Sequence, residues 1–166
     1  PFNPVLRLSG GGTYNAIKAA FPFLKNSQRA KSINFSGGGA PGPRPMFSAY
    51  AASKAAIVNL TENLAREFAE KKLTIDINAV APGAVNTRLL QEAITAGERI
   101  ENPENSLPEK AAALCLFLAS SASDGLSGKL ISAIHDDWET IPRRLKEIMA
   151  SDIYTMRRIK TENGKY

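Results

Sequence analysis

The sequence predicts an α/β protein built as a three-layer, doubly wound parallel sheet in one domain. Strand-like and helix-like segments alternate three times along the 166 residues, a pattern typical of parallel strands joined by right-handed helical crossovers. Apolar residues make up 43% of the chain and charged residues 22%, as in ordinary globular domains. The longest uninterrupted apolar run, Ala111–Ala119, is far shorter than the roughly 18 residues that a bilayer span needs. We therefore expect no membrane segment.

The first third of the chain is expected to contain two strands and a helix. Residues 4–8 resemble a short apolar strand, and Gly10–Gly12 a turn that follows it. A helix is predicted over Thr13–Leu24, because apolar residues recur there at i, i+3, i+4 and i+7. A strand follows over 31–37. The segment 37–45 must then be a loop, because its three prolines remove backbone donors.

The rest of the chain continues the alternation. Helices are predicted over Phe47–Ala69, Thr87–Ala96 and the apolar stretch up to Ala119, and strands over 71–83 and 128–134. Residues 97–108 are expected to be a linker, in which the sequence Ser106–Glu109 has the form of a capping box that opens the next helix.

The last segment, 135–166, is predicted to be a C-terminal tail, with an amphipathic stretch over Trp138–Met156. It begins with His135, Asp136 and Asp137, which are metal-binding residue types. Because three adjacent residues on one turn converge poorly on a single ion, we expect a solvated turn and no metal site.

The distribution of charge and the single cysteine bear on the partners and the cellular compartment of the protein. The net charge is +5, but lysines and arginines are scattered, with dense basic stretches only at Arg143-Arg144 and 157–160 and no interleaved aromatic stripe. This pattern predicts no nucleic-acid partner. The single cysteine, Cys115, lies among apolar helix residues and is expected to pack in the core, which fits a reducing, cytoplasmic compartment. The chain starts at Pro1 without a signal-peptide pattern, so we expect a trimmed or processed start.

Gly37, Gly39 and Gly42 match the spacing G-x-G-x-x-G of a dinucleotide-binding loop. Such a loop needs free backbone amides and a helix that begins directly after it. Here prolines remove amides, and no acidic residue for a ribose stands about 20 positions downstream. We therefore interpret these glycines as room beside a ligand and not as a phosphate cradle. The earlier run Gly10–Gly12 keeps an alternative interpretation as a degenerate phosphate turn.

Two tyrosines have a lysine four positions on, Tyr50 with Lys54 and Tyr14 with Lys18. Residues at this spacing share a helix face, and a nearby ammonium favours the phenolate form of a tyrosine. Tyr50 follows a strand and a loop, where the ligand crevice of a parallel sheet forms. Tyr14 has no such surroundings, so we predict a structural role for it.

The segments 33–68 and 75–90, with the motifs SAYAASK and PGAVNT, resemble the catalytic half of the short-chain dehydrogenase/reductase family. The resemblance implies a Rossmann-like fold and a nicotinamide cofactor, NAD or NADP. It implies Tyr50 as general acid/base and cofactor-binding residue, Lys54 as its partner and ribose ligand, and Ser36 as the residue that holds the substrate oxygen. The loop expected to close on the nicotinamide comprises Pro82, Gly83, Val85 and Thr87.

The sequence departs from the family pattern in three respects, the first being that Ser9 stands where the family has an asparagine at the start of the preceding helix. The family serine lies thirteen residues before the tyrosine, where this chain has Gly37, so Ser36 must reach from one position earlier. The first half of the fold, with its glycine-rich cofactor loop, has no counterpart here, so the expected sheet is incomplete. Either separate pieces of a longer chain are joined, which we favour, or the chain is a true fragment that binds no cofactor.

The predicted function is therefore an NAD(P)-dependent oxidoreductase that transfers a hydride between a nicotinamide and a small carbonyl or secondary alcohol. The resemblance also implies a homodimer or homotetramer. The alternative is a catalytically incomplete scaffold or oligomerisation module of the same fold, whose alanine-rich helix faces pack a partner subunit.

Overall fold

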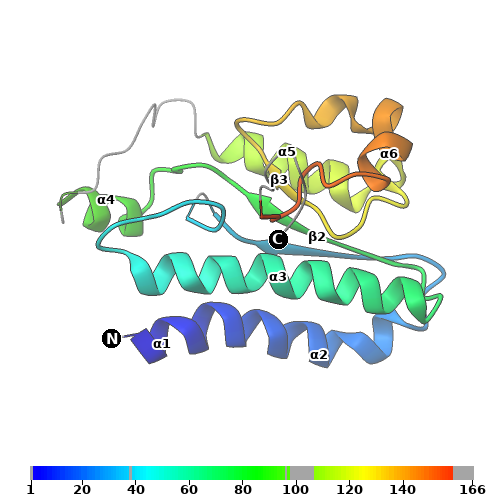
Figure 1. Ribbon diagram of the computed structural model, residues 1–166, viewed down its shortest axis with the longest axis horizontal. Helices are drawn as coiled ribbons and strands as arrows, with labels where there is room; N and C mark the ends of the chain where they lie inside the picture. Colours follow the sequence, from blue (N-terminus) through cyan, green and yellow to red (C-terminus); the bar gives the residue numbers. More distant parts are fainter. Residues whose placement is uncertain (1, 38, 96, 98–106, 159–166) are drawn as a thin grey trace, which may run out of the picture.

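Three parallel strands form the centre of the molecule in the computed structural model, which describes residues 2–37, 39–95, 97 and 107–158 (Figure 1). The strands are β1 Ala30–Phe35, β2 Ile75–Ala81 and β3 Leu130–Ser132, in the sheet order β1-β2-β3. Ala30 pairs with Ile75, and Val80 pairs with Ile131. Each predicted strand after residue 30 is confirmed, although β3 has only three residues.

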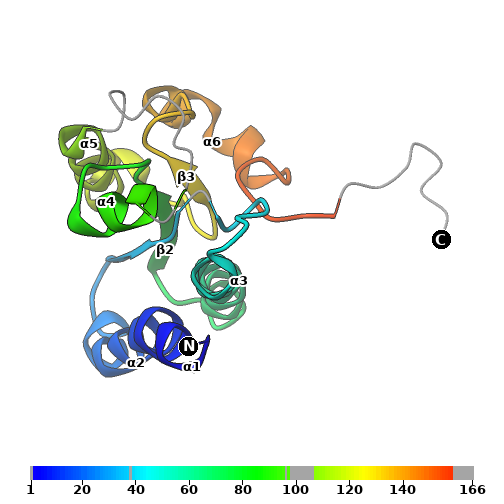
Figure 2. The same cartoon turned by 90° about the vertical axis from the view of Figure 1, so that its left-hand side faces the viewer.

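Helices cover both faces of the sheet, as Figure 2 shows in a view along the long axis of Figure 1. On one face lie α2 Gly12–Leu24 and α3 Ser48–Glu70, and on the other α5 Pro108–Ala119 and α6 Ile141–Met149. The remaining elements are α1 Phe2–Leu6, the π-helical turn η1 Arg7–Gly11, α4 Arg88–Thr95, and two short 3-10 turns, η3 Ser121–Ser123 and η4 Trp138–Thr140. The predicted three-layer fold class is confirmed. In the described part of the chain, no helix combines the length and the apolar character needed to cross a bilayer.

Each face of the sheet has its own core. On the α5 side, Leu114, Leu118 and Ile131 are essentially inaccessible to solvent. On the α2 and α3 side, Ile17 and Phe68 pack with strand residues that include Ile77. Because β2 is covered on both faces, it is buried almost without interruption.

The predicted strand over 4–8 and the turn over Gly10–Gly12 are wrong. Residues 2–24 are helical throughout, passing from α1 through the π-helical turn η1 into α2. Gly12 has a φ of −61° and so adopts an ordinary helical conformation. An apolar run of five residues fits a strand and a helix equally well, and glycine allows a turn without requiring one. The degenerate phosphate turn is wrong for the same reason.

The start of α5 differs from the predicted capping box. The residue that precedes the helix is Leu107, and Pro108 occupies its first turn, whereas Ser106 lies outside the described residues. Most of the predicted linker 97–108 also lies outside them. Within the predicted amphipathic stretch Trp138–Met156, the structure has the turn η4 and the helix α6, which ends at Met149.

The C-terminal segment is fastened to the sheet by a buried lysine. Lys129, which is 4% exposed, precedes β3, and its Nζ donates hydrogen bonds to the carbonyl oxygens of Ile148 (2.8 Å), Ser151 (3.0 Å) and Ile153 (2.9 Å). These carbonyls stand at the C-terminal end of α6 and just beyond it, where intrahelical donors are missing. The ammonium therefore closes the end of α6 and holds the segment that follows.

Two buried asparagines make specific contacts around the sheet. Asn34 of β1 donates through Nδ2 to Oγ1 of Thr61 on α3 at 2.9 Å. Asn78 of β2 donates to the carbonyl of Leu126 at 2.7 Å and accepts a bond from the backbone N–H of Lys129 at 3.1 Å. The amide groups of both side chains thus have partners in the interior, as buried polar groups require.

Candidate functional site

The carboxyl ends of β1 and β2 meet at one edge of the sheet. Phe35, the last residue of β1, is paired with Val80, one residue before the end of β2. The following segments, 36–47 and 82–87, therefore leave the sheet side by side, and Figure 1 shows the start of α3 and α4 at this end. This edge is where parallel α/β sheets bind ligands. All seven residues predicted for the site belong to these two segments or to the first two turns of α3.

Tyr50 lies in the first turn of α3 with its hydroxyl beside Gly37. A Cβ atom placed on Gly37 would stand 3.3 Å from the Tyr50 Oη. The Tyr50 ring is close to two cations: the Arg44 guanidinium carbon is 4.9 Å from its centroid, and the Lys54 Nζ is 5.4 Å from it. Cations at these distances are attracted by the ring face. The glycine leaves space at the hydroxyl while the cations hold the ring.

Lys54 lies one turn further along α3. Its Nζ donates a hydrogen bond to the carbonyl oxygen of Phe35 at 3.1 Å, across the end of β1. Burial lowers the pKa of the Lys54 ammonium below its ordinary value. Since an ammonium has three donors, this bond leaves two for other acceptors at the sheet edge.

The Ser36 hydroxyl is hydrogen-bonded to the backbone of α3. The residue is 2% exposed, and its Oγ donates to the carbonyl oxygen of Lys54 at 3.0 Å. Its backbone N–H donates to Val80 at 2.8 Å and so continues the pairing of β1 with β2. The serine thus ties the end of the strand to α3, and the loop residue that faces the Tyr50 hydroxyl is Gly37. The spacing of thirteen residues between Gly37 and Tyr50 was the signal for this in the sequence.

The second loop, 82–87, turns at Gly83 and leads into α4. Gly83 has a φ of +86°, a left-handed conformation that side-chain-bearing residues seldom adopt. The Thr87 Oγ1 accepts a hydrogen bond from the backbone N–H of Leu90 at 3.3 Å and so caps α4. Pro82 and Val85 are half-buried between these two points. The loop therefore brings the N-terminal end of α4 to the same edge as Tyr50.

The glycine-rich loop packs against α3. A Cβ atom on Gly39 would lie 3.2 Å from the Arg44 Cδ and 3.4 Å from the Cα of Ala51. This close packing accounts for a glycine at position 39 and does not require a phosphate-binding loop. It also positions Arg44, which the sequence analysis did not single out, because an arginine between two prolines has no spacing that marks it.

The second tyrosine–lysine pair is on the outer surface of α2. Tyr14 is 49% exposed, and Lys18 is exposed as well. Neither residue lies at the carboxyl ends of the strands. The two pairs share one spacing and differ in their surroundings, which makes Tyr14 and Lys18 useful control positions.

Comparison with known proteins places the chain among dehydrogenases. Residues 2–97 match the family model for short chain dehydrogenases. The chain is 30% identical to the 3-oxoacyl-[acyl-carrier-protein] reductase of Thermotoga maritima over 135 residues, covering 78% of this chain and 54% of that protein.

Solved structures give the same result. A short-chain dehydrogenase from Pseudomonas syringae superposes with a TM-score of 0.70 at 29% identity, covering 80% of this chain and 52% of that one. A 3-oxoacyl-[acyl-carrier protein] reductase from Brucella melitensis with bound NAD gives a TM-score of 0.64 at 27% identity, covering 79% and 49%. The chain spans about half the length of these relatives. With a match to the family model over more than half of its residues, the chain belongs to the short-chain dehydrogenase family.

Proposed function

We propose that this chain supplies the catalytic half of an NAD(P)-dependent oxidoreductase that interconverts a carbonyl compound and a secondary alcohol. The observation that carries the proposal is the Tyr50 hydroxyl, which stands beside Gly37 at the carboxyl ends of β1 and β2 with Lys54 one turn away. Relatives with the same fold include a reductase with bound NAD. A bound nicotinamide would accept or deliver the hydride.

In this proposal, Tyr50 moves the proton. Its Oη gives a proton to the carbonyl oxygen of the substrate during reduction and takes it back during oxidation. The substrate oxygen would lie within hydrogen-bond distance of this hydroxyl, at the carboxyl ends of β1 and β2. Arg44 and Lys54, near the ring, stabilise the negative charge that develops on the phenol oxygen. Ser36 holds the end of β1 on α3 and so fixes the position of Gly37.

The residues present fit the nicotinamide end of such a cofactor. Lys54 offers ammonium donors to ribose hydroxyls, and the loop of Pro82, Gly83, Val85 and Thr87 offers backbone groups near the start of α4. We assign these residues to cofactor binding. The choice between NAD and NADP, the substrate, a dimeric or tetrameric assembly and a cytoplasmic location stay predictions.

A pair of lysine variants tests cofactor binding. Lys54→Ala is expected to weaken NADH or NADPH binding by at least about tenfold, because charge-assisted hydrogen bonds to the ligand are lost. Lys18→Ala, in the outer pair, is expected to bind like the unmodified chain. Binding is measured by nicotinamide fluorescence and by the shift in melting temperature. Equal affinities of the two variants, or no binding to the unmodified chain, would contradict the proposal, and the second outcome would favour the scaffold.

The position beside the tyrosine hydroxyl gives a further prediction. Gly37→Ser is expected to raise kcat/KM for ketone reduction by about tenfold, because its hydroxyl adds a donor near the substrate oxygen. Gly37→Ala adds the same Cβ at 3.3 Å from the Tyr50 Oη without a donor and is expected to give no increase. Steady-state kinetics with one ketone compares the two variants. An equal fall in both would show that the space itself is what the reaction needs.

A further inference from the structure

Arg44 holds a fixed position over the ring of the proposed acid/base. Its guanidinium carbon is 4.9 Å from the ring centroid of Tyr50 and 5.5 Å from that of Phe47. The backbone N–H of Phe47 donates to the Arg44 carbonyl oxygen at 3.1 Å and closes the turn that carries both side chains. The stem of the arginine packs on the glycine-rich loop, where a Cβ atom on Gly39 would stand 3.2 Å from the Arg44 Cδ. Two rings and the loop therefore orient the guanidinium.

The two chain segments that form the site contain basic residues and no acidic ones. Segment 36–61 runs from the end of β1 into α3, and segment 77–91 runs from β2 into α4; neither contains an aspartate or a glutamate. The basic residues of these segments are Arg44, Lys54 and Arg88. Charges of one sign at a site attract ligands of the opposite sign. This edge of the sheet is therefore suited to an anionic ligand.

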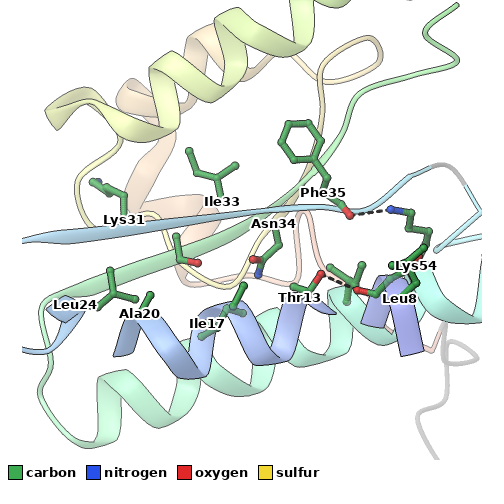
Figure 3. A pocket seen from close by; sticks show the side chains of 14 residues that line it. Leu8, Thr13, Ile17, Ala20, Leu24, Lys31, Ile33, Asn34, Phe35 and Lys54 are labelled. Atoms are coloured by element: carbon green, nitrogen blue, oxygen red, sulfur yellow. Dashed lines mark hydrogen bonds between the residues drawn. The ribbon is translucent and has the colours of Figure 1, made fainter. Parts of the chain in front are cut away.

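The three cations have different surroundings. Lys54 directs its ammonium to the carbonyl oxygen of Phe35 at 3.1 Å, as the dashed line in Figure 3 shows. Arg88, on α4, is ion-paired within its own helix, and its side chain is 92% exposed. Arg44 lies over the ring whose hydroxyl is the proposed proton donor, that of Tyr50. Its guanidinium has five N–H donors in a planar fork that matches the two oxygens of a carboxylate.

We propose that Arg44 selects substrates that carry a carboxylate close to the reacting carbonyl, that is, short keto acids and the corresponding hydroxy acids. The carboxylate accepts N–H bonds from the guanidinium while the carbonyl oxygen accepts the proton of the Tyr50 hydroxyl, so two contacts fix the orientation of the carbonyl. Because both protein groups lie at one phenol ring, the two substrate groups must be near each other. Reduction gives the hydroxy acid, with the proton from the Tyr50 Oη on its oxygen. The assignment rests on the proposed function, since it places the carbonyl at Tyr50.

The test compares acetoacetate with acetoacetamide, which has nearly the same shape and no charge. For the unmodified chain, we expect kcat/KM for reduction to be at least about tenfold higher with the acid, and Arg44→Gln should bring this ratio to about 1. The ratio is the readout because a weaker support of Tyr50 affects both substrates equally. Arg66→Gln, which removes an ion-paired arginine further along α3, should keep the ratio. A ratio near 1 in the unmodified chain, or one that Arg44→Gln leaves unchanged, overturns the proposal. An equal fall in Arg66→Gln also overturns it, because net charge would then select the acid.

Binding measured without turnover separates this proposal from the catalytic one. Acetoacetate is titrated into the isotope-labelled full chain, and the Arg44 Nε–H signal is expected to shift saturably, whereas acetoacetamide should not shift it. If the chain reduces neither compound, these shifts decide: their presence supports carboxylate binding at Arg44 and removes the proposed function, and their absence overturns both. Equal reduction of the two compounds keeps the proposed function and overturns the carboxylate assignment. A loss of NADH affinity in Arg44→Gln with an unchanged ratio would assign the guanidinium to the cofactor and overturn the assignment as well.

Discussion

Tyr50→Phe is expected to lower kcat/KM for ketone reduction by at least about 100-fold, the usual contribution of a positioned general acid or base. The variant keeps the ring between the Arg44 and Lys54 cations and removes only the hydroxyl beside Gly37. Cofactor affinity should therefore change little. The measurement is NADPH or NADH oxidation with a panel of small ketones, together with a cofactor titration of the same variant.

Tyr14→Phe is the matched control. It removes the hydroxyl from the other tyrosine–lysine pair, in which the residue Tyr14 is 49% exposed on α2. Activity should stay within about twofold of the unmodified chain, because the residue lies away from the sheet edge. Full activity in Tyr50→Phe, or an equal loss in both variants, would remove Tyr50 from the reaction.

Lys129→Met is expected to lower the free energy of unfolding by about 3 kcal/mol. The substitution removes three hydrogen bonds from a buried ammonium and leaves the carbonyls of Ile148, Ser151 and Ile153 without that donor. Lys146→Met, on the exposed side of the same helix, is expected to cost within about 0.5 kcal/mol. Urea unfolding curves of both variants measure the difference. Similar losses would mean that the general charge of the helix end, and not the buried contact, stabilises α6.

The effect of Lys129 also depends on pH. Burial lowers the pKa of the Lys129 ammonium from its ordinary value of 10.5, an effect that Asp152 opposes. Between the lowered pKa and 10.5, the unfolded chain binds more protons than the folded chain, so the contribution of Lys129 to stability rises with pH. The gap between the unmodified chain and Lys129→Met should widen on the alkaline side and stop widening near pH 10.5. A gap that narrows there would contradict this assignment.

The order of elements after residue 30 was predictable from local sequence signals. Apolar residues that recur about every 3.6 residues indicated α3, and Pro82-Gly83 indicated the end of β2. The helix over Thr13–Leu24 was predictable, but the helical form of residues 2–12 was not, since Gly10–Gly12 have low helix propensity and an apolar run fits either element. Contacts with α3, which no local pattern encodes, accompany the helical form there.

The sequence predicted which residues lie at the candidate site but not the directions of their side chains. The spacing of Tyr50 and Lys54 placed both on one helix face, and the structure sets them 5.4 Å apart as ring centroid and Nζ. The direction of the Ser36 hydroxyl depends on strand parity and on a bond to the backbone of Lys54. Neither can be read from spacing alone. Arg44 was not predicted as a site residue, because its position beside Tyr50 depends on how the proline-rich loop before α3 folds.

The two buried asparagines, Asn34 and Asn78, help to fix the register of the strands in the sheet. A strand that slips by one residue turns its interior side chains to the opposite face. In such a slipped state, Asn34 would lose Thr61, and Asn78 would lose both the Leu126 carbonyl and the Lys129 amide. Each buried amide left without a partner costs about 1–3 kcal/mol. Apolar side chains alone would allow several strand registers of comparable energy. The two buried amides raise the free energy of the slipped registers and so favour the native register during folding.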